Sequence, residues 1–126
     1  MIVNDPTILA EITAVFARYE TALMEDDVAM LDALFWKSPL ALRYGVGERL
    51  YGHAAITAFR RARGGSPRRR ILKQVITTYG ADFATADIEF QREGEDRIGR
   101  QSQSWVRMQE GWRIVAAHVS LEASKS

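Results

Sequence analysis

The feature that most constrains the fold is a long stretch near the end of the chain, residues 99–121. Gln103 to Met108 and Trp112 to Leu121 consist mostly of β-branched, aromatic and small residues, and Gln109 to Gly111 between them supplies a turn. Two such runs around a short turn containing glycine predict a β-hairpin. The rest of the chain can be fitted around this hairpin.

The second strand of this hairpin suggests a pocket. Side chains alternate between the two faces of a strand, so one face is expected to carry Trp112, Ile114, Ala116, His118 and Ser120 and the other Arg113, Val115, Ala117, Val119 and Leu121. Both faces are mostly apolar, which is typical of a strand covered on both sides. His118 and Ser120 then need polar partners inside, and a pocket would supply them. Val115, Val119 and Leu121 would form an apolar outer face that a partner covers.

The first strand of the hairpin begins with polar residues on both faces. Arg100 to Ser104 runs directly into Trp105 without a turn signal. Half of these side chains, Gln103 among them, would face the body of the protein and need hydrogen bonds there. They form either a structural polar network or contacts to a ligand, and the sequence leaves both open.

The chain begins with a predicted helix. Asp5 is a suitable N-cap and Pro6 a suitable first residue, and spacings of three and four place Leu9, Ile12, Phe16, Tyr19 and Leu23 on one face of a helix running to about Glu25. Tyr19 is therefore expected to face inward, as a core residue or as a catalytic one. A second helix is predicted from Val28 to Phe35, in a V with the first.

A short strand is predicted at Leu40 to Tyr44, after Pro39 breaks the helical pattern. Its two faces differ, because Arg43 lies between the small residues Ala41 and Gly45, which leaves space beside the guanidinium. Arg43 is either a solvent-facing residue on an edge strand or an anion anchor in a cavity.

A second short strand, Arg49 to Tyr51, could pair with the first, and a helix from Ala54 to about Arg63 follows. His53 is expected at the surface near the start of that helix. Residues 60–70 then contain six arginines and a Gly-Gly-Ser-Pro connection, and a solvated basic patch is favoured over a nucleic-acid site because no aromatic residues are interleaved.

Arg70 is the expected exception, because it begins a strand from Ile71 to Tyr79 whose alternation could turn it inward. Strands from Phe83 to Arg92 and from Arg97 onward complete the series. This order predicts one α+β domain, residues 1–126, with a curved antiparallel sheet wrapped around three helices as a cone-shaped barrel. Such wrapping could bring together Tyr19, Arg43, Arg70, Gln103, His118 and Ser120.

Composition excludes several kinds of site. The chain has no cysteine and only two histidines, which argues against thiolate chemistry and a conventional metal site. A formal net charge of +1 provides no field that would recruit nucleic acid or membrane. Because no signal peptide and no membrane-spanning stretch is evident, we expect a cytoplasmic protein.

Several segments together resemble a known family. They are FARYE at residues 16–20, LFW at 34–36, RYG at 43–45, AFR at 58–60, GRQSQSW at 99–105 and GWRIVAAHVS at 111–120. Within the nuclear transport factor 2-like superfamily, which includes ketosteroid isomerase and the SnoaL-like proteins, they are similar to the AtzH-like proteins, a group that includes the oxalurate-catabolism protein HpxZ. The similarity covers almost the whole chain.

The resemblance implies a cone-shaped α+β barrel, a homodimer, and an amidase and a GatC-like small subunit as partners. It further implies a decarboxylating amidohydrolase that acts on a carboxylated urea or ureido acid, as in the conversion of dicarboxyurea to allophanate. It assigns catalytic roles to Tyr19 and Arg43. Together with the pattern arguments, it makes Trp36, Arg70, Gln103, His118 and Ser120 the candidate contacts to a small anionic substrate, with no metal and no cofactor.

The residues suggest how such a reaction could proceed. Arginine can bind carboxylates bidentately, and a tyrosine hydroxyl can donate a proton to the nitrogen of the leaving amine. Activation of water by His118 is an alternative. The competing hypothesis is a non-catalytic ligand-binding or accessory subunit of an amidase complex. Ketosteroid isomerase chemistry is not expected, because its acidic groups have no clear counterpart on the inward faces.

Overall fold

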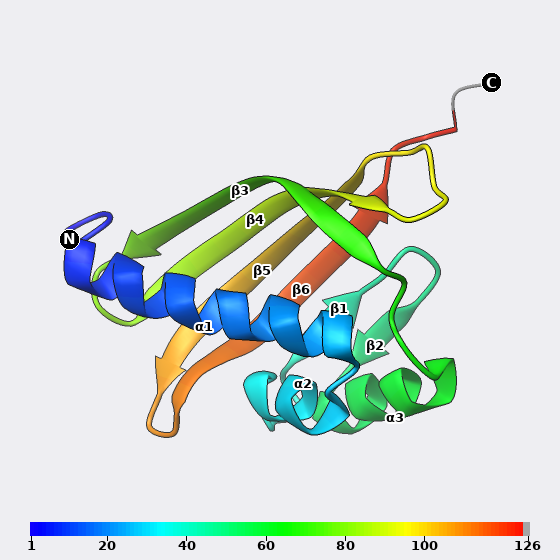
Figure 1. Cartoon of the computed structure of the whole chain (residues 1–126). Helices are drawn as coiled ribbons and strands as arrows, with labels where there is room; N and C mark the ends of the chain where they lie inside the picture. Colours follow the sequence, from blue (N-terminus) through cyan, green and yellow to red (C-terminus); the bar gives the residue numbers. More distant parts are fainter. Residues whose placement is uncertain (125–126) are drawn as a thin grey trace.

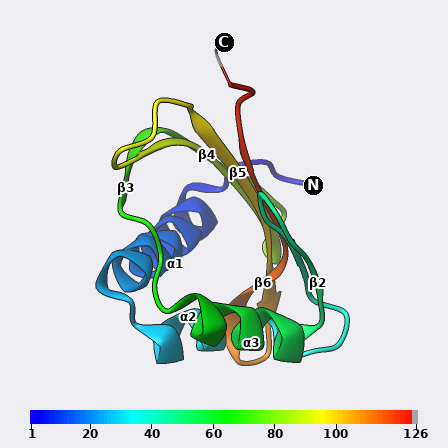
Figure 2. The same ribbon diagram turned by 90° about the vertical axis from the view of Figure 1, so that its right-hand side faces the viewer.

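The computed structural model of the chain describes residues 1–124 (Figure 1). In chain order the elements are α1 (Pro6–Glu25), α2 (Val28–Leu34), β1 (Leu42–Tyr44), β2 (Arg49–Tyr51), α3 (His53–Arg63), β3 (Arg69–Tyr79), β4 (Phe83–Arg92), β5 (Gly99–Met108) and β6 (Gly111–Leu121). The strands form one sheet in the order β2-β1-β6-β5-β4-β3. Seen from its end, this sheet curves around the helices (Figure 2). The predicted cone-shaped α+β fold is confirmed.

One strand pair differs from the antiparallel arrangement expected for the whole sheet. β1 and β6 run parallel, with Arg43 opposite Ala117, whereas every other neighbouring pair of strands is antiparallel. β1 and β6 are far apart in the chain, so no hairpin turn between them imposes opposite directions. The sheet is therefore mixed at this one junction.

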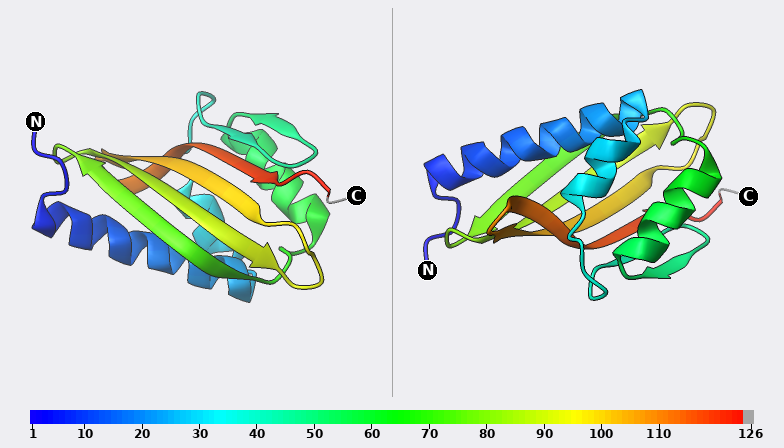
Figure 3. Two further views of the ribbon diagram at one scale, coloured as in Figure 1. Left: turned by 90° about the horizontal axis from the view of Figure 1, so that it is seen from above. Right: turned by 90° about the horizontal axis from the view of Figure 1, so that it is seen from below.

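α1 begins and ends where the sequence predicts. The Asp5 carboxylate accepts hydrogen bonds from the backbone N–H groups of Thr7 and Ile8, and Asp26 ends the helix in the left-handed conformation. Its buried stripe consists of Ile12, Phe16, Tyr19, Ala22 and Leu23. The helix lies across the concave side of the sheet (Figure 3), so Tyr19 faces the interior. Neither α1 nor any other helix within residues 1–124 is long and apolar enough to cross a membrane.

The predicted hairpin is formed by β5 and β6, and its inward side chains lie at the centre of the core. Trp105 on β5 and Ile114 on β6 are fully buried. Upstream, β1 begins at Leu42 rather than Leu40, which is 74% exposed. His53 is half-buried rather than at the surface, and its Nε2 lies 2.8 Å from the carbonyl oxygen of Asp32.

A β-bulge in β6 reverses the expected orientation of its last residues. Ser104 pairs with Ala116 but Trp105 pairs with Ile114, so Val115 is an extra residue on β6. An extra residue shifts the alternation by one position. The prediction that His118 and Ser120 face inward is therefore wrong: His118 is exposed, and Ser120 is on the same outer side. Ala117 and Val119 are buried instead and Leu121 packs against the core, so Val119 and Leu121 are not on an exposed outer face.

A second β-bulge, in β3, reverses the expected orientation of an arginine, Arg70. Ile71 pairs with Phe90 but Lys73 pairs with Glu89, so Leu72 is the extra residue. Strict alternation along β3 would turn Arg70 inward, and that prediction is wrong because the bulge intervenes. Arg70 is exposed, whereas the side chain of Arg69 is only 5% exposed.

Gly99 allows β5 to begin close to the ring of Phe90. A Cβ at residue 99 would collide with that ring, on which the guanidinium of Arg69 stacks 4.5 Å from the ring centre. We expect Gly99→Ala to lower the free energy of unfolding by about 1–3 kcal/mol, because the ring has to move within a packed core. Urea denaturation measures the change. Gly47→Ala is the control, since a Cβ there meets nothing within 4 Å. Equal stability of the two variants would contradict the expectation.

Candidate functional site

The interior of the cone contains a small polar cavity between α1, α3, β1 and the ends of β3, β4 and β5. It is lined by Tyr19, Leu23, Arg43, Arg60, Arg63, Ser66, Pro67, Arg69, Arg92, Gln101 and Val119. Its volume is about 30 Å³, enough for a water molecule or two. Five of the lining residues are arginines and none is acidic, so the cavity is built to hold negative charge.

Three carboxylates outside this lining neutralise part of that charge. Arg43 pairs with Glu48 at 2.6 Å, Arg60 with Asp32 at 3.2 Å, and Arg69 with Glu20. Within residues 1–124, Arg63 and Arg92 have no carboxylate partner within ion-pair distance. Two of the five guanidinium charges are thus left uncompensated, an arrangement that favours an anionic ligand.

Aromatic rings hold the guanidinium groups in place. The Arg43 and Arg63 guanidiniums lie 5.6 Å and 5.5 Å from the centre of the Phe59 ring. Those of Arg69 and Arg92 lie 4.5 Å and 5.7 Å from the Phe90 ring. Arginine stacks well on aromatic faces, and the contact keeps its hydrogen-bonding edge free.

Several hydrogen-bond donors around the cavity have no acceptor. The buried Nε atoms of Arg63 and Arg69 and the buried Nε2 of Gln101 lack a partner within residues 1–124. Buried donors are normally paired, and a site in which they are not is expected to bind an acceptor. An anion with several oxygen atoms would satisfy them.

The pKa values of two arginines reflect this crowding of positive charge. Burial lowers the pKa of the Arg63 guanidinium, the charges of Arg43 and Arg60 lower it further, and Tyr19 opposes the shift. Burial likewise lowers the pKa of the Arg92 guanidinium, with contributions from Arg69 and Arg43. Both shifts have the same physical cause, positive charge that is partly buried beside other positive charges, and an anion bound in the cavity would offset it.

Tyr19 is the only tyrosine, histidine or cysteine that lines the cavity within the described part of the chain. Its ring packs on Phe16 with centres 6.2 Å apart and meets the edge of Trp105 at 6.4 Å. Within residues 1–124 its hydroxyl makes no hydrogen bond to another residue, although the residue is only 5% exposed. This hydroxyl is available as a proton donor to a bound ligand.

The structure brings some of the sequence-predicted site residues together and separates others. Tyr19 and Arg43 both line the cavity. Gln103 is buried but is not part of the lining, and its Oε1 accepts a hydrogen bond from the Trp105 indole N–H at 3.0 Å. Trp36 lines a separate surface groove. Arg70, His118 and Ser120 lie outside the cavity because of the two bulges.

Sequence reasoning missed five lining residues: Arg60, Arg63, Arg69, Arg92 and Gln101. Arg60 and Arg63 lie three residues apart on α3, one helical turn beyond the buried Ile56, so helical periodicity could have placed them inward. Period-two alternation could likewise have placed Gln101 beside Gln103 and Arg92 beside Phe90. Arg69 has no such signal, because the bulge at Leu72 hides it.

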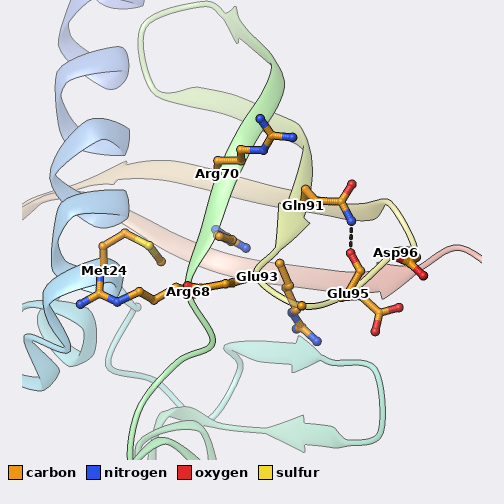
Figure 4. Close-up of a pocket in the computed structure, with 10 residues that line it drawn as sticks. Met24, Arg68, Arg70, Gln91, Glu93, Glu95 and Asp96 are labelled. Atoms are coloured by element: carbon orange, nitrogen blue, oxygen red, sulfur yellow. Dashed lines mark hydrogen bonds between the residues drawn. The ribbon is translucent and has the colours of Figure 1, made fainter.

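A larger, open groove adjoins the cavity at the outer end of the sheet. Its volume is about 610 Å³, and its lining shares Arg69 and Arg92 with the cavity. Figure 4 shows Met24 and Arg68 on one side and Gln91, Glu93 and Glu95 on the other, with the side chain of Arg70 extending away from them. A ligand larger than the cavity would extend into this groove.

Comparison with known proteins finds one family model and several solved structures that match nearly the whole chain. The family model described as AtzH-like matches residues 1–125. A Pectobacterium atrosepticum protein of unknown function from the DUF3225 family is 56% identical, with a TM-score of 0.93 and coverage of 96% of this chain and 95% of that one. A cystatin-like fold protein from Burkholderia xenovorans is 45% identical, with a TM-score of 0.94 and 98% coverage of both chains.

A nuclear transport factor 2-like superfamily protein from Salmonella enterica is more distant. It is 25% identical to this chain, with a TM-score of 0.76 and coverage of 95% of this chain and 94% of the other. No match was found among curated proteins.

Proposed function

The chain belongs to the AtzH-like family, with a nuclear transport factor 2-like fold, and on this premise we propose that it decarboxylates a carboxylated urea or ureido acid. The observation that carries the proposal is the pairing of one buried tyrosine with five arginines in a cavity that no acidic residue lines. Such a cavity suits a substrate that contributes the negative charge itself. A dicarboxyurea-type substrate fits this description.

In the proposed reaction, a substrate carboxylate attached to nitrogen leaves as carbon dioxide. Arg43 binds and orients the substrate through its carboxylate. The C–N bond breaks with its electron pair left on nitrogen, and the Tyr19 hydroxyl donates a proton to that nitrogen. Water returns a proton to Tyr19, so the net change is uptake of one proton and release of carbon dioxide. Guanidinium groups stabilise the negative charge that develops on this nitrogen.

Tyr19→Phe tests the role of the hydroxyl. We expect turnover to fall by about 10²-fold or more, because general-acid catalysis contributes that amount. Substrate binding should change little, since the arginines remain. Carbon dioxide and allophanate release from freshly generated dicarboxyurea measures turnover, after subtraction of the spontaneous rate.

Tyr79→Phe is the matched control, because Tyr79 lies outside the cavity and is partly exposed. It should match the wild-type protein. Turnover by Tyr19→Phe at the wild-type rate would show that this hydroxyl is not the proton donor.

The second candidate function is that of a non-catalytic binding subunit of an amidase complex. The small volume of the cavity favours it, because about 30 Å³ holds a carboxylate-sized group more readily than a whole ureido acid. A GatC-like small subunit would then be a further partner. A wild-type protein that leaves the spontaneous rate of decarboxylation unchanged, yet binds the purified amidase, would favour this function.

A homodimer is also part of the proposal. On the outer face of β3 and β4 the side chains of Val75, Tyr79 and Phe83 are 47%, 36% and 37% exposed. Exposed apolar side chains on adjacent strands are often covered by a partner. Sedimentation of the wild-type protein and of Phe83→Glu tests this, because a charge in the interface should give a monomer.

A further inference from the structure

The unsatisfied donors in the cavity come from three separate elements. Arg63 belongs to the last turn of α3, Arg69 is the first residue of β3, and Gln101 lies on β5. The two guanidinium Nε atoms and the Gln101 amide nitrogen are all buried and without an acceptor within the described residues. All three side chains line the same cavity. Three buried donors without acceptors among the residues of one cavity are candidates to bind oxygen atoms of a ligand.

These donors are held in position by other contacts. The second guanidinium nitrogen of Arg63 donates to the Ser66 hydroxyl at 2.7 Å. Arg69 donates to Glu20 and, at 3.1 Å, to Oε1 of Gln101. The hydrogen bond from Arg69 fixes the Oε1 atom of Gln101, so the amide nitrogen of Gln101 is directed away from Arg69. A preorganised set of donors binds an anion with little loss of side-chain entropy.

We propose that Arg63, Arg69 and Gln101 form a second anion subsite beside Arg43, so that the cavity selects ligands with two negative groups. This inference rests on the proposed function, since it concerns the same cavity. The charge balance supports it: five guanidiniums line the cavity, and at most three carboxylates pair with them, one of which, Asp32, also pairs with the exposed Arg61. A dianion would neutralise the two remaining charges, whereas a monoanion would leave one uncompensated.

The subsite has a consequence that an ordinary structural arginine would not have. Arg63 is half-buried near Arg43 and Arg60, its Nε atom is fully buried, and it has no carboxylate partner within residues 1–124, so its charge opposes folding. Arg63→Met keeps the apolar stem over Phe59 and removes the charge. We expect this variant to melt at a higher temperature than the wild-type protein in the absence of ligand, and to bind dianions at least about tenfold more weakly.

The experiment compares malonate with acetate at constant ionic strength, by thermal shift and isothermal titration calorimetry. The wild-type protein should bind malonate at least about tenfold more tightly than acetate. Arg63→Met should lose this preference. Arg49→Met is the control, because Arg49 is exposed on β2 outside the cavity lining, and this variant should retain the preference. A wild-type protein that does not distinguish the two anions would overturn the proposal, as would an Arg63→Met variant that retains the preference.

A second variant tests the subsite without removing an arginine. Gln101→Glu is nearly isosteric and places a carboxylate beside Arg69, where it competes with the ligand and compensates the guanidinium. We expect it to fold at least as well as the wild-type protein and to lose malonate binding at neutral pH. Gln109→Glu adds the same charge in the exposed turn between β5 and β6 and should leave malonate binding unchanged. Wild-type malonate affinity in Gln101→Glu would overturn the proposal.

Failure of this inference and failure of the proposed reaction can be told apart. Malonate preference that depends on Arg63, together with no acceleration of decarboxylation, would support the subsite and reject the reaction. Tyr19-dependent turnover without any preference for dianions would support the reaction and reject the subsite.

Discussion

Arg43→Ala is expected to reduce decarboxylation of dicarboxyurea by about 10²- to 10³-fold, close to the spontaneous rate. This is the usual loss when one preorganised group that stabilises charge is removed from an active site. Arg43 lines the cavity with Tyr19, its side chain is 13% exposed, and Glu48 and the ring of Phe59 fix its orientation. Carbon dioxide and allophanate release measures the rate.

Arg49→Ala is the matched control for Arg43→Ala. Arg49 lies on the adjacent strand β2 and is exposed, so its removal should leave turnover unchanged. A folded Arg43→Ala protein, verified by circular dichroism and thermal melting, that accelerates the reaction as the wild type does would exclude Arg43 from the site. Loss of activity in both variants would instead show that the reaction depends on the intact β1–β2 strand pair and not on the Arg43 guanidinium alone.

Trp105→Ala is expected to have the largest effect on stability, lowering the free energy of unfolding by about 3–5 kcal/mol. Trp105 is the largest fully buried side chain. Its removal would leave a void beneath Tyr19, whose ring meets its edge, and would leave the Oε1 of Gln103 without its indole N–H donor. Urea denaturation followed by circular dichroism measures the loss.

Trp36→Ala is the comparison for Trp105→Ala. Trp36 is half-buried at a surface groove, so its truncation should cost clearly less, because water can fill part of the space. If the two variants lose similar amounts of unfolding free energy, burial in the interior of the cone does not determine how much a tryptophan contributes to stability. Trp105→Ala should also weaken binding of malonate, because Tyr19 loses a packed neighbour.

Part of the site could be predicted from periodicity. The three-and-four spacing along α1 correctly placed Tyr19 inward. The space predicted beside Arg43 from the small residues Ala41 and Gly45 is taken next to Gly45 by the Glu48 carboxylate, although Arg43 itself lines the cavity. The alternation of β5 placed Gln103 inward. Arg63 was assigned with residues 60–70 to a solvated patch, although the helix predicted to about Arg63 is confirmed and its periodicity was not applied to that residue.

The sequence by itself determined the elements, their order and the fold class, because helix caps, turn residues and hydrophobic periodicity are local properties of the chain. Only the tertiary structure decided which side chains face the cavity at the ends of the long strands. The bulges at Leu72 and Val115 each shift the alternation by one residue, exchanging Arg70 for Arg69 and His118 for Val119. A bulge belongs to the pairing of two strands in a curved sheet, so the sequence of one strand does not reveal it.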